Sequence, residues 1–315
     1  MTNLALVIQR WDPKPWVDRF KTYAPELNVF VWPAEGVDPA SVDYALAWLP
    51  PEGVLAGFPN LKAVFSLGAG VDHILSEPKL PDVPLVRIVD PNLTMRMSEY
   101  VCLHVLMHHR QQRHFDEAQR KGVWSGRKQW AASALRVGVM GMGELGRDAA
   151  VKLVHLGFQV NGWSNSRKEV DGVTSYAGQG ELDAFLAATD ILVCLLPHTP
   201  ATEGILNRAL FRKLASDGLL GAPMIINAGR GKLQVETDII ASLDAGELGA
   251  ATLDVFETEP LPASSPLWTH PKVTVTPHNA ADSEPEALCK YILRQIKAYE
   301  SGGALENVVD KKAGY

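Results

Sequence analysis

The sequence has few cysteines, no excess of positive charge and no long hydrophobic run. Cys102, Cys194 and Cys289 are far apart and form no CxxC pair, so we expect buried thiols rather than a disulfide framework or a zinc site. A net charge of −6 offers no basic surface to a phosphodiester backbone, which argues against nucleic acid as a partner. No apolar run is long enough to span a bilayer, and the opening MTNLALVIQRWD lacks the pattern of a signal peptide. We therefore expect a cytoplasmic protein with no membrane partner.

The length of 315 residues exceeds that of a usual single domain, so two domains are expected, each with its own core. Short apolar segments alternate with helical stretches, a pattern typical of parallel α/β sheets. The first series of expected strands comprises residues 4–8, 27–32, 44–50, 61–68 and 84–89. The second series comprises residues 135–140, 158–163, 190–196, 222–228, 251–256 and 273–278. The sequence thus predicts an α/β protein with two Rossmann-like or flavodoxin-like domains built on parallel sheets.

A long helical segment separates the two series. Apolar residues at 97, 101, 105 and 106 predict a helix over 98–120 that opens at Ser98 as its N-cap and connects the domains. The segment from about Ser283 to Tyr315 predicts another helix followed by a polar tail, which could pack back onto the first domain.

A glycine-rich loop follows the first strand of the second series. RVGVMGMGELG places Gly141, Gly143 and Gly146 in a GxGxxG pattern between a buried strand and the helical stretch DAAVKLVHLG. The first glycine permits a tight turn, the second lets the backbone approach a pyrophosphate, and the third allows close packing of the helix, whose N-terminus attracts anions. This context predicts a dinucleotide-binding loop, whereas the same glycines without it would be weak evidence.

The next strand ends in a polar, basic turn, NGWSNSRK. An NAD-preferring site usually has Asp or Glu at this point, about 20 residues after the glycines, to bind the ribose hydroxyls. Here Ser164 stands in that place and is followed by Asn165, Ser166, Arg167 and Lys168, which could bind a 2′-phosphate. The turn favours NADPH over NADH, although for Lys168 a purely solvated role is the better interpretation.

Three polar residues in the last third of the chain can perform carbonyl chemistry: Arg230 in INAGRG, Glu259 in DVFETEP and His278 in TVTPHNA. Reduction of a 2-oxo acid requires a cation that holds the carboxylate and polarises the carbonyl, and a proton donor suited to neutral pH, such as a histidine paired with a carboxylate. Arg230 and His278 follow strands, where open α/β sheets bind ligands. Glu259 is the weaker candidate, because a Glu before Pro is usually a solvated turn residue.

Four further histidines lie in the connecting helix. His104 and His108 have i, i+4 spacing and His109 and His114 are close by, but no HExxH carboxylate accompanies them. We interpret them as part of a solvated or subunit-facing surface. Hydride transfer from a nicotinamide needs no metal, so none is predicted.

Over nearly its whole length the chain resembles the D-isomer-specific 2-hydroxyacid dehydrogenases. The likeness is strongest to their glyoxylate/hydroxypyruvate reductase A group, through YALAWLPP, LKAVFSLGAGVDHIL, LLPHTPATEGIL, INAGRG, LDVFETEPLPASSPLW and VTPHNAA. This resemblance implies a substrate domain of residues 1–97 and 284–315, into which an NAD(P)-binding Rossmann domain of residues 98–283 is inserted. It also implies a homodimer, to which the 98–120 helix would contribute.

The resemblance assigns roles to the polar trio. Arg230 would bind the substrate carboxylate and carbonyl, His278 would donate the proton, and Glu259, rather than its neighbour Glu257, would hold His278. Asn279 replaces an apolar residue that is common in the wider family. Asn165 replaces an arginine that is frequent in the group, which weakens the expected preference for NADPH.

Other site residues also follow from the resemblance. Backbone amides near Ala69 and Gly70 would bind the substrate carboxylate, and Trp48 would exclude bulky 2-oxo acids, although a core or surface-turn tryptophan fits the sequence equally well. The expected cofactor-binding residues are Gly141, Met142, Gly143, Glu144, Leu145, Gly146, Ser164, Asn165, Ser166, Arg167, Pro197, Thr199, Ala228 and Asp254. Among these, Pro197 and Thr199 would pass the ribose and Asp254 would contact the nicotinamide carboxamide.

Together these features predict an NADPH-dependent reductase of small 2-oxo acids, with NADH as the alternative cofactor. The expected reactions convert glyoxylate to glycolate and hydroxypyruvate to D-glycerate. Two alternatives stay open: the same chemistry on a larger 2-oxo acid, and a non-catalytic protein that senses NAD(P).

Overall fold

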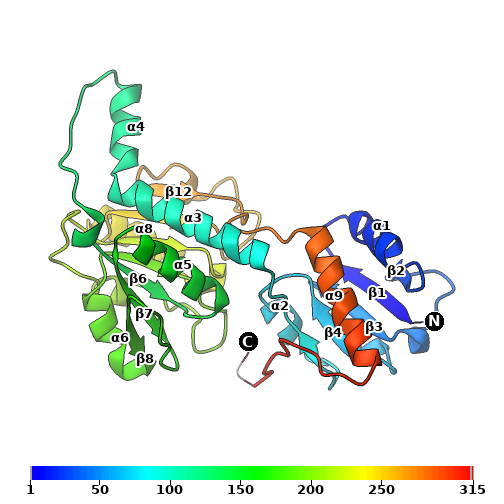
Figure 1. The fold of residues 1–315 in the computed structure, drawn as a ribbon. Helices are drawn as coiled ribbons and strands as arrows, with labels where there is room; N and C mark the ends of the chain where they lie inside the picture. The colour runs from blue at the N-terminus through cyan, green and yellow to red at the C-terminus, as the bar shows by residue number, and fades with distance from the viewer. Residues whose placement is uncertain (1, 313, 315) are drawn as a thin grey trace. The chain divides into compact units, whose positions relative to one another are not determined.

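The computed structural model describes residues 2–312 and 314 and divides the chain into two compact units. Unit 1 comprises the residues up to Leu93 and those from Ser283 onward, and unit 2 runs from Thr94 to Asp282. The sequence placed these boundaries at 97/98 and 283/284. Each unit contains one parallel sheet (Figure 1), so the predicted α/β fold with two parallel sheets is confirmed.

The sheet of unit 1 has the strand order β2-β1-β3-β4-β5, which is the order of flavodoxin-like folds. Its strands are β1 (Asn3–Ile8), β2 (Asn28–Val31), β3 (Tyr44–Trp48), β4 (Ala63–Ser66) and β5 (Leu85–Val86). The helices of this unit are α1 (Lys14–Tyr23), α2 (Asp72–Leu75) and α9 (Pro285–Glu300). Phe20 of α1 and Ile292 of α9 join one hydrophobic core, so the C-terminal helix packs with unit 1 (Figure 1).

The sheet of unit 2 has the order β12-β11-β10-β9-β6-β7-β8, which is the order of six-stranded dinucleotide-binding sheets with one additional edge strand. Its strands are β6 (Arg136–Met140), β7 (Gln159–Ser164), β8 (Val173–Ala177), β9 (Ile191–Cys194), β10 (Met224–Asn227), β11 (Ala250–Leu253) and β12 (Val273–Val275). The strand β8 was not predicted from the sequence. This edge strand is only partly buried, so its segment lacks the apolar run that identified the others.

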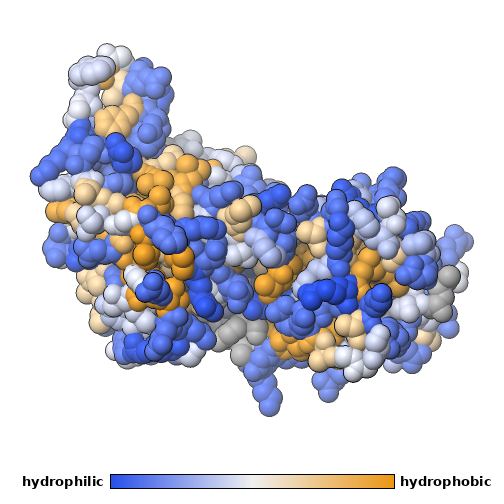
Figure 2. Space-filling view, in the orientation of Figure 1, coloured by the Kyte–Doolittle hydropathy of each residue, from blue (hydrophilic) through white to orange (hydrophobic). Residues whose placement is uncertain are grey.

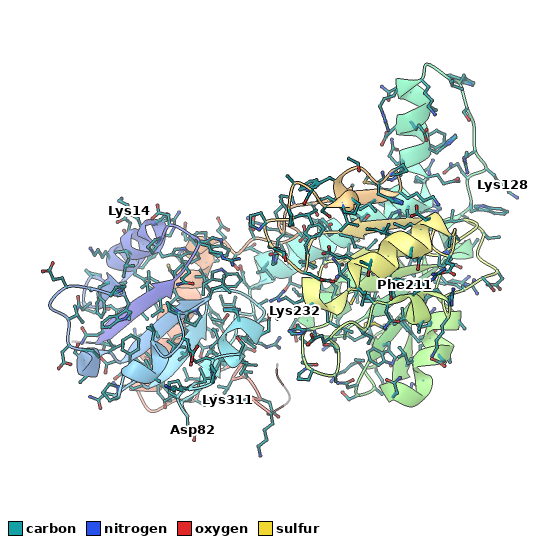
Figure 3. All side chains as sticks on the ribbon, turned by 180° about the vertical axis from the view of Figure 1, so that it is seen from behind. Lys14, Asp82, Lys128, Phe211, Lys232 and Lys311 are labelled. Carbon is teal, nitrogen blue, oxygen red and sulfur yellow. The ribbon has the colours of Figure 1, made fainter. Side chains whose placement is uncertain are left out.

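Helices cover both faces of this sheet. They are α3 (Pro91–His109), α4 (Gln112–Arg120), α5 (Glu144–His155), α6 (Gly178–Ala187), α7 (Arg208–Phe211) and α8 (Glu236–Asp244). Val101 of α3 and Leu153 of α5 belong to one core, whereas Phe185 of α6 and Phe211 of α7 belong to another. Phe211, labelled in Figure 3, belongs to this second core and is fully buried.

Short 3-10 helices complete the fold at Pro39–Ser41, Leu55–Gly57, Ala132–Ala134, Gly231–Leu233 and Pro266–Trp268. Among residues 2–312 and 314, no helix combines the length and apolar composition needed to cross a membrane.

The helix between the two series of strands starts earlier than predicted. It begins at Pro91, whose fixed φ suits the first turn of a helix, and the Asp90 carboxylate accepts a hydrogen bond from the Asn92 amide at 3.1 Å. Ser98 is therefore inside the helix and is not its N-cap. Its hydroxyl donates to the Asp148 carboxylate at 2.5 Å, a partner 50 residues away that local sequence could not reveal.

The same segment also contains a break that was not predicted. Gln111 adopts a left-handed backbone conformation with φ of 56°, which L-residues tolerate poorly within a helix. The backbone therefore leaves α3 after His109 and starts α4 at Gln112, so the single helix over 98–120 was wrong.

Candidate functional site

Two of the three motif glycines are required by close backbone packing. Gly141 follows β6 with φ of 109°, and a Cβ there would lie 2.8 Å from the Leu195 carbonyl. At Gly146, in the first turn of α5, a Cβ would lie 1.9 Å from the Gly141 carbonyl oxygen. Gly143 is different, because a Cβ built on it meets nothing within 4 Å. The loop is thus held by its first and third glycines and leaves open space at its second, just where α5 presents its unpaired N-terminal amides.

This difference predicts two distinct outcomes for alanine substitutions in the loop. Gly146→Ala forces a Cβ onto a backbone carbonyl and is expected to cost about 1–3 kcal/mol of unfolding free energy or more. Gly143→Ala is expected to leave stability unchanged but to raise the Kd for NADPH by at least about tenfold, because the methyl fills the open space. Thermal unfolding and fluorescence titration with NADPH measure the two effects. Normal NADPH affinity in a folded Gly143→Ala protein would show that the pyrophosphate does not bind there.

The predicted basic turn follows β7 and is exposed. The Ser164 hydroxyl donates to the Ser166 carbonyl at 2.8 Å. Arg167 is already engaged: it donates to the Ser175 carbonyl and to the Glu181 carboxylate, both at 2.5 Å. Hydroxyl, amide and guanidinium groups therefore gather at the carboxyl end of β7, and the Arg167 cation is shared with Glu181.

The loop after β9 contains the next predicted residues, Pro197 and Thr199. It is folded on itself through Thr202, whose hydroxyl donates to the Pro197 carbonyl at 2.7 Å and accepts the Thr199 amide at 2.8 Å. Ala228 directly follows β10 and is buried. All three positions lie at the carboxyl edge of the seven-stranded sheet, together with the glycine loop.

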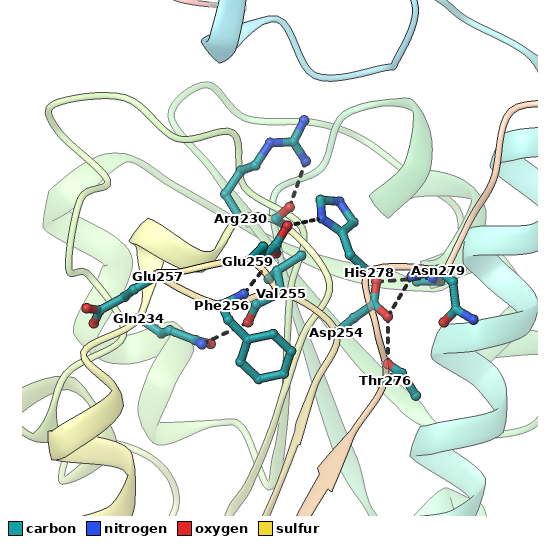
Figure 4. A network of polar contacts seen from close by, with 12 residues as sticks. Arg230, Gln234, Asp254, Val255, Phe256, Glu257, Glu259, Thr276, His278 and Asn279 are labelled. Atoms are coloured by element: carbon teal, nitrogen blue, oxygen red, sulfur yellow. Dashed lines mark hydrogen bonds and ion pairs between the residues drawn. The ribbon is translucent and has the colours of Figure 1, made fainter. Parts of the chain in front are cut away.

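Backbone crowding positions Arg230. A Cβ at Gly229 would lie 2.8 Å from the Leu196 carbonyl oxygen, and one at Gly231 would lie 1.8 Å from that of Phe256. Only glycine fits on either side, because the segment passes between the backbones of Leu196 and Phe256. The Arg230 side chain therefore extends away from the sheet edge (Figure 4). The guanidinium donates to the Gly229 carbonyl at 2.8 Å. Behind it, the buried Asn227 amide donates to the Gln234 side chain at 2.8 Å, which fixes the turn.

Glu259 and His278 form a direct pair. The Glu259 carboxylate lies 2.7 Å from His278 Nδ1, and its other oxygen accepts the Phe256 amide at 3.0 Å. Burial acts to raise the pKa of the Glu259 carboxyl, but the hydrogen bond and charge of His278, with help from Arg230, hold this pKa below its usual value. Because Nδ1 faces Glu259, the Nε2 atom is directed elsewhere and can carry a proton to a ligand. Figure 4 shows the trio gathered at one edge of the sheet.

The backbone of His278 is held by Asp254. His278 has a left-handed φ of 54°, and its amide donates to the Asp254 carbonyl at 2.8 Å. The buried Asp254 carboxylate accepts hydrogen bonds from the Thr276 hydroxyl and from the amides of Asn279 and Ala280, at 2.6, 3.1 and 3.0 Å (Figure 4). These contacts make Asp254 the anchor of the His278 segment. The resemblance assigned Asp254 to the nicotinamide carboxamide, and this anchoring role was not predicted, because its partners follow 22 to 26 residues later.

The Glu259 charge predicts a specific pH effect. Because its folded-state pKa is lowered, the carboxylate stays charged at more acidic pH than an ordinary glutamate does, and the pair is lost only as pH falls through that lowered value. Glu259→Gln removes the charge that stabilises the protonated imidazole. The part of the kcat/KM profile at acidic pH that reports ionisation of Glu259 is therefore expected to disappear in this variant, and kcat/KM at neutral pH is expected to fall by at least about tenfold. The control is Glu257→Gln, whose carboxylate accepts a backbone amide of Glu236 instead; an equal change in both variants would contradict a specific role for Glu259.

The histidines of α3 occupy positions that differ from the prediction. His104, His108 and His109 are buried, so they do not form a solvated or subunit-facing surface. His108 Nε2 lies 3.1 Å from the Thr252 hydroxyl, and burial lowers the pKa of His108 to about 3. The face of α3 turned to the sheet carries these rings as neutral core groups. In the part of the chain that the structure describes, no three His, Cys, Asp or Glu side chains come together as a metal site.

The predicted substrate-binding residues of unit 1 lie at the carboxyl edge of its sheet. Trp48 ends β3, while Ala69 and Gly70 are in the loop between β4 and α2. The Ser66 hydroxyl organises this loop by donating to the Gly68 and Gly70 carbonyls at 2.8 and 3.3 Å. Within residues 2–312 and 314, the amides of Ala69 and Gly70 donate no hydrogen bond. They are therefore available to an anionic ligand.

Comparisons with known proteins find a family model for the middle of the chain and similar proteins over nearly all of it. The model of the NAD binding domain of D-isomer specific 2-hydroxyacid dehydrogenases matches residues 102–280. Glyoxylate/hydroxypyruvate reductase A of Yersinia enterocolitica is 41% identical over 311 residues, which cover 97% of each protein.

Two solved structures extend this similarity to the fold. One is an NADPH-dependent glyoxylate/hydroxypyruvate reductase from Sinorhizobium meliloti in complex with NADP and sulfate, which is 47% identical with a TM-score of 0.95 over all of both chains. The other is a D-isomer specific 2-hydroxyacid dehydrogenase from Xanthobacter autotrophicus in complex with NADPH and MES. It is 40% identical, with a TM-score of 0.94 over all of this chain and 99% of that one.

Proposed function

Because the chain belongs to the D-isomer specific 2-hydroxyacid dehydrogenase family, we propose that it reduces small 2-oxo acids with NADPH. The reactions would take glyoxylate to glycolate and hydroxypyruvate to D-glycerate, the substrates named for the curated relative. The observation that carries this proposal is the Glu259–His278 pair beside Arg230, at the carboxyl edge of a dinucleotide-binding sheet.

The cofactor would bind along the same edge. The open space at Gly143 and the free amides at the N-terminus of α5, from Met142 to Gly146, fit a pyrophosphate. Ser164, Asn165, Ser166 and Arg167 would bind the ribose and its 2′-phosphate, because no carboxylate stands at Ser164 to repel that group. Pro197, Thr199 and Ala228 would border the path toward the nicotinamide. When bound, NADPH supplies the hydride.

Arg230, Glu259 and His278 would each have a separate role in proton transfer and substrate binding. His278 would donate its Nε2 proton to the carbonyl oxygen, with Glu259 fixing the ring and stabilising its protonated form. Arg230 would hold the substrate carboxylate and stabilise charge on the carbonyl oxygen as it develops. Asp254 would act through the backbone of His278 rather than on substrate. The free amides of Ala69 and Gly70 would bind the carboxylate, with Trp48 beside them.

The assay that tests this function follows the absorbance of NADPH when glyoxylate or hydroxypyruvate is added to the purified protein. Loss of absorbance with either acid, and faster loss with NADPH than with NADH, is the expected result. Turnover of phenylpyruvate but not of glyoxylate would instead indicate a larger substrate. No turnover with any 2-oxo acid, together with retained NADPH binding, would indicate a sensor.

We also propose that the protein is a cytoplasmic homodimer. Residues 112–131, here called the arm, comprise α4 and the extended segment after it, and they project from the rest of unit 2 (Figure 1). Trp124 in the arm is fully exposed at 103%, and Leu103 of α3 is also exposed. Lys128 lies along the extended segment (Figure 3), and hydrophobic residues reach the surface of unit 2 at the base of the arm (Figure 2). Such exposure suits burial against a second copy; sedimentation as a monomer at micromolar concentration would contradict it.

A further inference from the structure

Two tryptophan side chains stack at the carboxyl edge of the sheet of unit 1. The rings of Trp11 and Trp48 have centroids 4.8 Å apart and planes inclined by only 17°. Trp48 is the last residue of β3 and pairs with Ile8 at the end of β1, while Trp11 follows three residues later. The Gln9 amide donates to the Trp48 carbonyl at 3.0 Å, which extends this pairing. The two rings are thus brought together by neighbouring strands.

Trp48 is also fixed from its other sides. The His73 ring lies 4.4 Å from it between centroids, at an angle of 57°. A Cβ added to Gly68 would lie 2.6 Å from the Trp48 ring, so the indole packs directly on the backbone that leads into Ala69 and Gly70. Trp48 therefore borders the very loop whose amides are free to bind a carboxylate.

The backbone beside both tryptophans is strained. Arg10, before Trp11, has φ of 67°, and Leu49, after Trp48, has φ of 47°. These are left-handed conformations that L-residues with bulky side chains rarely adopt, and such strain gathers at functional sites. Moreover, Trp11 remains 46% exposed, although a tryptophan that served only the core would be covered. The two strained residues destabilise the backbone beside the stack, and the stack leaves the Trp11 ring partly exposed to solvent. A role in packing alone does not account for this arrangement.

We propose that Trp11 is a positioning residue, which together with His73 holds Trp48 in place as an aromatic wall and so maintains the limit on substrate size that the family resemblance implies for Trp48. This inference rests on the proposed function and deepens it. A 2-oxo acid whose carboxylate is bound by the Ala69 and Gly70 amides would place its substituent within reach of the Trp48 ring. The wall accepts the hydrogen of glyoxylate or the hydroxymethyl group of hydroxypyruvate and excludes an aromatic side chain.

The test compares kcat and KM for glyoxylate and phenylpyruvate in wild type, Trp11→Ala and Trp11→Phe. In Trp11→Ala the Trp48 ring loses its support, so kcat/KM for phenylpyruvate relative to glyoxylate is expected to rise by about 10- to 100-fold. The KM for glyoxylate is expected to rise while its kcat changes little, because the reacting groups are untouched. Trp11→Phe retains a stacking ring and is expected to restore most of the wild-type preference.

The control is Trp268→Ala, since Trp268 is 50% exposed in unit 2 and lies outside the site. It removes an equally exposed indole and is expected to leave the preference unchanged. An unchanged preference in a folded Trp11→Ala protein, or an equal change in Trp268→Ala, would overturn the wall. Turnover of glyoxylate by the wild-type protein tests the proposed function separately, because that measurement is made with Trp11 intact.

Discussion

His278→Ala is expected to lower kcat for glyoxylate reduction by about 10²- to 10⁴-fold, the usual contribution of a general acid. The Kd for NADPH is expected to stay near its wild-type value, because the ring points to the Glu259 carboxylate and not into the glycine loop. Steady-state kinetics and fluorescence titration with NADPH separate the two quantities. The loss is expected in kcat rather than in KM, since a proton donor acts on the transition state.

The matched control for this substitution is His155→Ala, which removes an exposed histidine at the end of α5. It is expected to leave both kcat and NADPH affinity unchanged. If His278→Ala weakened NADPH binding as much as it slowed turnover, His278 would be a structural or cofactor-binding residue and the proton would come from another group.

Arg230→Gln is expected to lower kcat/KM for glyoxylate by at least about 10³-fold, because it removes both the ligand of the carboxylate and the charge that stabilises the developing alkoxide. Arg230→Lys keeps the charge but loses the planar, two-pronged geometry. We expect it to recover only a small part of the activity. The backbone on both sides of Arg230 is tightly packed. It therefore cannot shift to bring a shorter lysine side chain closer to the substrate carboxylate.

Lys232→Gln provides the control for charge in the same segment, because Lys232 is exposed and only two residues away. An equal loss of activity in this variant would mean that a general positive field, and not the Arg230 contact, drives catalysis. Full activity of Arg230→Lys would exclude bidentate binding of the carboxylate.

Local sequence was sufficient for the features that follow directly from strand ends. The glycine loop, Arg230 and His278 each come after a short apolar run, and parallel strands present their carboxyl ends at one edge. The family predicted from these motifs is confirmed. Glu259 was the weakest assignment, and in the structure it lies 2.7 Å from His278.

What the sequence did not reveal depends on contacts between distant residues. Ser98 resembled an N-cap because its partner, Asp148, is remote. The α3 histidines seemed exposed because their burial depends on residues that are distant in the sequence: His108 contacts Thr252 of β11, and His109 packs against Phe158. A role for Trp11 was not predicted, because only the pairing of β1 with β3 places its ring against that of Trp48.

The strand order of unit 2 has a consequence for how such proteins diversify. The glycine loop and the basic turn belong to β6 and β7, on one side of the point where the order reverses, while Arg230 and His278 follow β10 and β12 on the other. The groups proposed to select the cofactor and those proposed to reduce the carbonyl thus occupy separate halves of one sheet. A lineage could exchange one nicotinamide cofactor for another by substitutions in the first half and inherit the chemistry of the second unaltered.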